Sequence, residues 1–176
     1  MEPIRTERLD LVPASLDLLE ADLASPAALG RLLGAAVPAS WPPGEYDRAA
    51  MEFFRARLLE DPKSVGWYGW YAIHALEEGG AVVIGAAGYL GPPDSDGGVE
   101  LGYSIAPEFQ ARAFATEIVQ ALTAHAWSFP GIQRVIAHTQ PSNEASVKVL
   151  ERCGFRLAGS AGDGKAVEYE RLRPAT

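Results

Sequence analysis

Between residues 99 and 105, bulky apolar residues alternate with small or polar ones, which predicts a β-strand. The bulky apolar residues are Val99, Leu101, Tyr103 and Ile105, and the small or polar residues between them are Glu100, Gly102 and Ser104. The second set places a carboxylate, a bare backbone and a hydroxyl on one face of the strand. We therefore expect that face to form the wall of a cleft.

A helix is predicted after this strand, because apolar residues recur with helical spacing at Phe114, Ile118, Ala121, Leu122, Ala126 and Phe129. Pro107 has no amide with which to extend a strand, so the change from strand to helix is expected near residues 108–110. The unpaired amides of residues 111–115 would then point outward, where hydrogen bonds and the helix dipole favour an anion. This stretch is a candidate phosphate-binding site.

The remaining segments predict a mixed sheet covered by helices. Strands are expected over residues 4–12, 67–76, 81–90 and 134–139, with two more strands joined by residues 161–165. Helices are expected to begin at Ser15 and at Ser25-Pro26, to cover about 46–58, and to run from about 143 to 152. This order favours helices on both faces of one sheet.

The segment 37–45, VPASWPPGE, is too rich in proline and glycine for regular structure. Its Trp41 fits two interpretations, a wall of a substrate pocket or a rigid connector whose tryptophan packs on the core. His74 lies in an apolar strand and is interpreted as a packing residue rather than a catalyst.

Composition narrows the class of protein. The 176 residues predict a single domain over 1–176, and the single cysteine, Cys153, favours a reducing compartment. With a net charge of −8 and no cluster of Lys and Arg, we expect no nucleic-acid partner. No apolar run is long enough to span a bilayer, so we expect no membrane partner and a cytoplasmic protein.

Residues 100–117, ELGYSIAPEFQARAFATE, resemble the acyl-CoA-binding motif of the GNAT N-acetyltransferases, in the branch that includes the ribosomal-protein N-terminal acetyltransferases. That branch has the pattern Gln/Arg-x-x-Gly-x-Gly/Ala. Ala111 and Ala113 stand where it usually has glycine, which adds two methyl groups where the backbone would approach a pyrophosphate.

A second stretch, residues 143–155, resembles the other GNAT signature, Asn-x-x-Ser-x-x-x-Leu-x-x-x-Gly-Phe. Asn143 is also a good helix N-cap, and capping alone would account for it. The family uses the position of Ser146 to bind the pantetheine arm or to protonate the leaving thiolate. Lys148 is interpreted as solvated, and Cys153 is given no nucleophilic role.

The resemblance implies an α/β (α+β) fold with a mixed, mostly antiparallel central sheet of about seven strands and helices on both faces. It implies acetyl-CoA as co-substrate, without a metal. The residues implied to contact this co-substrate are Ser104, Ile105, Ala106, Gln110, Ala111, Arg112, Ala113, Phe114, Ala115, Thr116, Asn143 and Ser146.

The reaction implied by the resemblance is direct attack of a primary amine on the thioester. Glu100 is the candidate base, and the alternative is that Glu100 forms a structural ion pair with an arginine such as Arg134. Ser146 is the preferred acid, in competition with Tyr103 and Tyr169. The acceptor is expected to be a protein N-terminus, a peptide or a small molecule, and a homodimer is compatible with the resemblance.

A second hypothesis is a non-catalytic binding or regulatory module of the same fold. In that hypothesis the methyl groups of Ala111 and Ala113 narrow the cofactor groove and weaken CoA binding.

Overall fold

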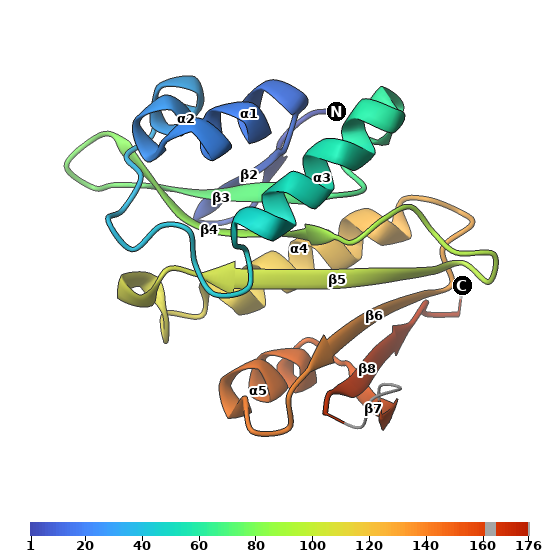
Figure 1. Cartoon of the computed structure of the whole chain (residues 1–176). Helices are drawn as coiled ribbons and strands as arrows, with labels where there is room; N and C mark the ends of the chain where they lie inside the picture. Colours follow the sequence, from blue (N-terminus) through green and yellow to red (C-terminus); the bar gives the residue numbers. More distant parts are fainter. Residues whose placement is uncertain (161–164, 176) are drawn as a thin grey trace.

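The computed structural model describes residues 1–160 and 165–175, which form one eight-stranded sheet. The strands are β1 (Ile4–Arg5), β2 (Leu9–Pro13), β3 (Gly69–Ala75), β4 (Ala81–Tyr89), β5 (Gly98–Ile105), β6 (Arg134–Thr139), β7 (Arg156–Ser160) and β8 (Val167–Leu172). Their spatial order is β1-β2-β3-β4-β5-β6-β8-β7, and of the pairings between them β5 with β6 alone is parallel (Figure 1). The predicted mixed, mostly antiparallel sheet is confirmed.

Helices cover both faces of this sheet, as predicted (Figure 1). Three helices, α1 (Leu16–Ala24), α2 (Pro26–Leu33) and α3 (Arg48–Glu60), pack against β3 and β4 in one apolar cluster. On the other face, α4 (Phe114–Trp127) and α5 (Glu144–Arg152) pack in a second cluster with alternate residues of the same strands. Because the central strands are buried on both sides, they are apolar at successive positions.

Side-chain caps fix where most of these helices begin. Ser15, Ser25, Asp47 and Asn143 each accept a hydrogen bond from an amide in the first turn of the helix that follows. The starts predicted at Ser15 and Ser25 are thus confirmed. The helix marked by apolar positions from Tyr46 to Leu58 was expected to end before Pro62, and it does, with bounds Arg48–Glu60; its start lies two residues later than expected.

Two boundaries were predicted wrongly. The single strand expected over 4–12 is divided into β1 and β2 by a turn, in which the Thr6 amide donates to the Leu9 carbonyl over 2.9 Å. The helix expected from about 108–110 begins only at Phe114, after a short 3-10 helix, η2 (Pro107–Phe109). The intervening backbone is left-handed at Ala111 and Ala113, which interrupts helical geometry. The turn expected at residues 161–165 lies mostly outside the described residues.

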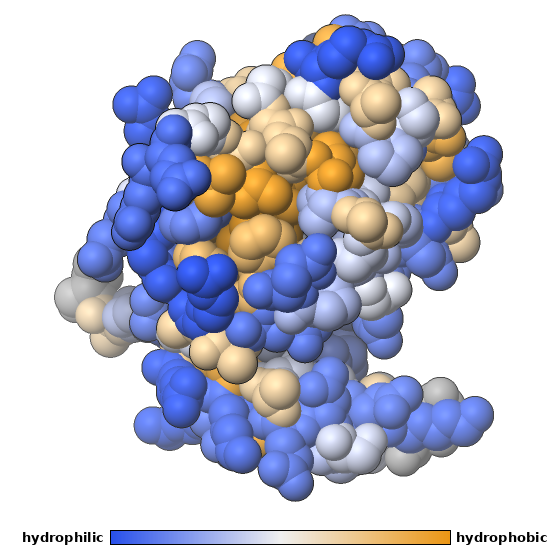
Figure 2. All heavy atoms as spheres, turned by 90° about the vertical axis from the view of Figure 1, so that its left-hand side faces the viewer, coloured by the Kyte–Doolittle hydropathy of each residue, from blue (hydrophilic) through white to orange (hydrophobic). Residues whose placement is uncertain are grey.

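The sheet opens between β5 and β6. Pairing between them covers Gly98–Glu100 of β5, whereas Leu101–Ile105 pair with β4 alone. On the other strand, His138 and Thr139 pair with β8. The two strands therefore diverge beyond Glu100, and the gap is visible on the left of Figure 1, above α5. Figure 2 views this end of the molecule and shows an apolar central region surrounded by hydrophilic side chains.

Candidate active site

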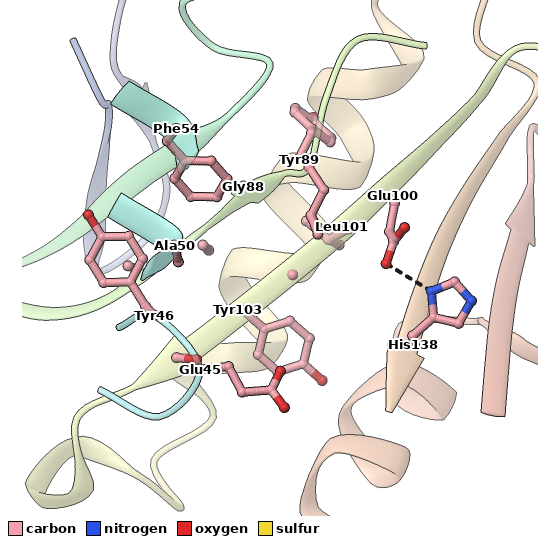
Figure 3. A pocket seen from close by; sticks show the side chains of 15 residues that line it. Glu45, Tyr46, Ala50, Phe54, Gly88, Tyr89, Glu100, Leu101, Tyr103 and His138 are labelled. Atoms are coloured by element: carbon pink, nitrogen blue, oxygen red, sulfur yellow. Dashed lines mark hydrogen bonds and ion pairs between the residues drawn. The ribbon is translucent and has the colours of Figure 1, made fainter. Parts of the chain in front are cut away.

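A cavity of about 220 Å³ lies against β4 and β5, next to α3 and the segment that leads into it (Figure 3). Glu100, Gly102 and Ser104 all border it, so the cleft wall predicted from the alternation of β5 is found. Of the apolar set, Tyr103 borders the cavity as well and is only partly buried, because β5 has no neighbouring strand beside it there. Val99, Leu101 and Ile105 are buried in the core.

Trp41 does not line this cavity. Its side chain is buried, and its indole nitrogen donates to Asp22 Oδ1 over 2.8 Å. Of the two interpretations of Trp41, the structure favours the tryptophan packed on the core. The wall of the cavity is formed instead by Glu45 and Tyr46, which follow a few residues later.

Glu100 is hydrogen-bonded to a histidine, not to an arginine. Its Oε1 atom lies 2.8 Å from Nδ1 of His138, and Nε2 of His138 lies 3.3 Å from Oε2 of Glu168. Arg134, the expected ion-pair partner, lies 3.9 Å from Asp94 instead. Glu100 of β5 is paired with Ile136 of β6 in parallel register. His138 follows Ile136 by two residues on the same face of β6, and its ring therefore reaches the Glu100 carboxylate.

His138 was not among the site residues predicted from the sequence, although it lies in the candidate site. Alternation in residues 134–139 places it on one face with Ile136, but only the register between β5 and β6 brings it to Glu100. Partial burial alone would lower the pKa of His138, but the Glu100 and Glu168 carboxylates raise it above the ordinary value. Below that raised pKa, the imidazolium lies between two carboxylates.

The predicted acid candidates Ser146 and Tyr103 are in direct contact. The Tyr103 hydroxyl lies 2.9 Å from Ser146 Oγ and donates to the Ser146 carbonyl over 3.3 Å. Burial raises the pKa of Tyr103 to about 12, although the hydrogen bond to Ser146 lowers it in part. Tyr103 is therefore protonated at neutral pH. Tyr169, the third candidate, is buried in the main core and does not border the cavity.

The loop between β5 and α4 presents amides without internal partners. Ala111 and Ala113 have φ values of 59° and 62°, the left-handed region that glycine favours, and Ala113 caps α4 without a side-chain hydrogen bond. Within the described residues, the amides of 111–116 make no hydrogen bond. At the two positions where the resemblance expects glycine, the backbone thus has a conformation that glycine favours, with two methyl groups added.

The other implied contact residues of this loop are partly engaged. The Ala106 amide donates to the Ile84 carbonyl over 2.9 Å, so it is not free for a ligand. The Gln110 side chain donates to the Ile105 carbonyl over 2.9 Å and holds the loop against β5. Thr116 Oγ1 is enclosed and has no hydrogen-bond partner among the described residues. The unpaired donors fit an anionic group at the start of α4.

The first turn of α4 is held by the segment between β1 and β2. Arg8 donates to the Arg112 carbonyl over 3.1 Å, and its guanidinium lies 4.4 Å from the centre of the Phe114 ring. Glu117 accepts hydrogen bonds from Thr6 Oγ1, at 2.6 Å, and from Arg8. Because the Glu117 carboxylate is bound to Thr6 and Arg8, it does not accept hydrogen bonds from the free amides of residues 111–116.

In α5, the amide oxygen of Asn143 accepts from the Ser146 amide at 3.1 Å, as capping predicts. Lys148 pairs with Glu144 at 3.3 Å. Cys153 is buried and donates to the Thr116 carbonyl, and burial raises its pKa to about 11, so it is a thiol at neutral pH. Among the described residues, no three ligand-type side chains come together to hold a metal, and no helix could cross a membrane.

The fold and the site together define a class, α/β proteins in which two parallel strands separate beside a loop of free amides. The acetyltransferase (GNAT) domain family matches residues 8–156, and the chain belongs to this family. It is 26% identical to YjdG of Bacillus subtilis, described as an uncharacterised N-acetyltransferase, over 95% of this chain and 94% of that one. Family and relative together identify an N-acetyltransferase.

Solved structures share the fold. Ribosomal-protein-S5-alanine acetyltransferase from Vibrio fischeri has a TM-score of 0.65 at 18% identity, over 98% of this chain and 97% of that chain. RimL, a ribosomal L7/L12 α-N-protein acetyltransferase, in complex with coenzyme A, has a TM-score of 0.64 at 19% identity, over 97% and 98%. At this identity the similarity concerns the fold.

Proposed function

We propose that the protein transfers an acetyl group from acetyl-CoA directly to a primary amine. The observation that carries this proposal is the placement of two kinds of group around the gap between β5 and β6. Glu100 borders it from the face of the sheet that α3 covers, and the Tyr103–Ser146 pair from the side of α5. A base and an acid on opposite sides of one gap suit a reaction that removes a proton from a nucleophile and supplies one to a leaving group.

The free amides of residues 111–116 are the proposed donors to the diphosphate of acetyl-CoA, and Ser104, Ile105 and Asn143 are proposed to lie beside its remaining length. Bound there, acetyl-CoA supplies an activated thioester. The loop contributes hydrogen bonds that need no rearrangement, since its left-handed backbone is already formed. A charge-assisted hydrogen bond contributes about 1.5–3 kcal/mol, so a few such amides are sufficient for binding.

Glu100 is the proposed general base. An α-amine, with a pKa of about 7.7–8.0, needs only about 1–1.4 kcal/mol to become neutral at pH 7, whereas a lysine side chain needs about 4.6 kcal/mol. The Glu100 carboxylate has one oxygen bonded to His138 and a second with which it can accept the amine proton. His138 is proposed as the residue that fixes the orientation of this carboxylate.

Ser146 is the proposed acid, and Tyr103 is the residue that positions its hydroxyl. Because the Tyr103 hydroxyl is protonated at neutral pH, its proton can rotate from the Ser146 carbonyl to Ser146 Oγ while Ser146 donates its own proton to the leaving thiolate. The two candidates thus act as one hydrogen-bonded pair in this proposal. Acceptors proposed for the reaction are a protein N-terminus, as in the ribosomal-protein branch, a peptide or a small amine in the cytoplasm.

Thermal unfolding with and without acetyl-CoA, together with the release of free thiol in the presence of an amine, tests the proposal. At about 100 times the dissociation constant, bound ligand adds about 2.7 kcal/mol. At this chain length, that is about 5–11 °C in Tm. A shift without thiol release for any amine would favour the binding or regulatory module. No shift at millimolar acetyl-CoA would contradict donor binding.

A further inference from the structure

The walls of the acceptor side carry negative charge. A second cavity of about 240 Å³ adjoins the first, and the two share Leu90 and Glu100. The described residues that line them include three carboxylates, Glu45, Asp94 and Glu100, and no Lys or Arg; His138 is the one lining residue that can carry positive charge. A surface of this kind attracts cations and disfavours anions.

Two of these carboxylates are already engaged. Asp94 accepts hydrogen bonds from the amides of Asp96 and Gly98, at 2.9 and 2.8 Å, and lies 3.9 Å from Arg134. Glu100 is bonded to His138. Glu45, in contrast, is exposed and has no hydrogen bond or ion pair with any described residue, so its carboxylate is free to bind a ligand.

The backbone that carries Glu45 is nevertheless held firmly. The next residue, Tyr46, is buried, and its hydroxyl contacts Asp22 at 2.9 Å and Tyr71 at 3.0 Å. On the other side, a Cβ atom added to Gly44 would lie 3.1 Å from Ser104 Oγ, so this backbone packs closely on β5. Glu45 is thus an unpaired carboxylate on a fixed segment at the rim of the cavity.

Apolar surface separates this carboxylate from Glu100. Ala50 and Phe54 line the same cavity, and Figure 3 shows Glu45 extending toward Tyr103, whose ring lies between Glu45 and Glu100. At about 220 Å³, the cavity is smaller than the 300–1,000 Å³ typical of drug-sized ligands. It fits a short aliphatic chain with polar groups at its ends.

We propose that the acceptor carries a second positive charge, separated from the reacting amine by a short apolar segment and paired with Glu45. This inference rests on the proposed function, because it places the reacting amine at Glu100. The chemistry is shared by two sources, an aliphatic diamine and a peptide whose N-terminal amine is followed by a basic side chain. Glu45 then determines specificity without taking part in proton transfer.

Steady-state acetylation of matched acceptors by the full chain tests this proposal. Aliphatic α,ω-diamines of increasing length are compared with monoamines of the same length, and peptides with lysine at the second position with peptides that have norleucine there. We expect kcat/KM to favour the dicationic member of a pair by about two- to fivefold, which is in the range of an exposed charge pair. The source with the larger ratio identifies the natural class.

Glu45→Gln is expected to bring the ratio between dicationic and monocationic acceptors close to one. The matched control is Glu77→Gln, which removes the same charge from an exposed residue that does not line either cavity, and should leave the ratio unchanged. The assignment of Glu45 would be overturned if the wild type acetylated dicationic and monocationic acceptors equally well. It would also be overturned if the ratio fell by the same factor in Glu45→Gln and Glu77→Gln.

Calorimetric titration of 1,5-diaminopentane into the protein without acetyl-CoA separates this inference from the proposed function. Binding that weakens about two- to fivefold in Glu45→Gln, with acetyl-CoA still bound normally, supports the second charge site. Absence of diamine binding in a protein that still acetylates monoamines would overturn the inference and leave the proposed function intact. A protein that binds neither acetyl-CoA nor amine would refute both.

Discussion

The hydroxyl of Tyr103 lies 2.9 Å from Oγ of Ser146, and this contact joins β5 to the first turn of α5 across the open part of the sheet. The two residues are 43 positions apart in the chain. In the sequence, Tyr103 and Ser146 are separate, competing candidates for the acid, whereas in the structure they form one hydrogen-bonded pair. Their proposed role as a shared acid leads to the first prediction.

We expect Tyr103→Phe and Ser146→Ala each to lower kcat by about 100-fold, the lower end of the 10²–10⁴-fold that general acid catalysis contributes. The double variant should lose little more than the worse single variant, because each change already disrupts the same unit. Steady-state kinetics with saturating acetyl-CoA measure the loss, and unchanged thermal stabilisation by CoA serves as the control. Losses that multiply would show that the two hydroxyls act independently.

Glu100→Gln is expected to lower kcat/KM by about 100-fold at pH 7, because a neutral amide cannot accept the amine proton. With an α-amine acceptor, whose pKa is about 7.7–8.0, the deficit should shrink toward pH 9 as the amine becomes neutral in solution. The measurement is a pH profile of kcat/KM for both proteins. A deficit that is constant from pH 6 to 9 would argue for a positioning role instead.

His138 should make the stability of the protein depend on pH. Its pKa is raised above the ordinary value of 6.5 in the folded state, so the folded protein binds the proton more tightly than the unfolded chain does. The contribution to stability is therefore complete below pH 6.5 and is lost as the pH rises through the raised value. Compared with His138→Gln, the wild type should show its largest advantage in Tm near pH 6, and a smaller one at pH 8.5. A difference in Tm that does not change with pH would contradict this assignment.

Replacing both loop alanines with glycine, Ala111→Gly with Ala113→Gly, should stabilise the protein and tighten CoA binding. A left-handed alanine costs about 1–2 kcal/mol, and the added entropy of glycine in the unfolded chain offsets about 0.4–1 kcal/mol of this. The net gain is about 0.5–1 kcal/mol for each site. Chemical denaturation measures the stability, and CoA titration the affinity. Unchanged affinity would mean that the methyl groups point away from the phosphates.

Asp22→Asn is expected to destabilise the protein by about 1–3 kcal/mol. The carboxylate of Asp22 is buried and accepts hydrogen bonds from Trp41, Tyr46 and Tyr71. The asparagine amide has only one acceptor oxygen, and its NH₂ group would face hydroxyl groups that also need an acceptor. Burial raises the pKa of Asp22, although these donors lower it in part. Because Trp41 and Tyr46 flank Glu45, KM for a dicationic acceptor should rise while CoA affinity stays the same. Thermal melts and kinetics measure both effects, and a loss of CoA affinity would show a more general disruption.

The sequence predicted the fold well because the patterns that carry it are local. Alternation along β5 and helical spacing in α4 and α5 are visible in the sequence, as are the capping residues Ser15, Ser25 and Asn143. The start of α4 was misplaced, because nothing local distinguishes a left-handed alanine from a helical one. The positive φ angles of the folded loop reveal that difference.

The sequence by itself determined the two motifs, and through them the choice of Glu100 and Ser146 as candidates. Each residue lies in a short strand or helix, in which the spacing of apolar residues predicts the face that its side chain occupies. The tertiary structure alone decided which groups face them. His138 reaches Glu100 through the parallel register of β5 and β6, Tyr103 reaches Ser146 across the gap, and Glu45 is carried to the same cavity by a segment fixed on Asp22. These relationships depend on strand register and on packing between distant segments, and neither property is a function of local sequence.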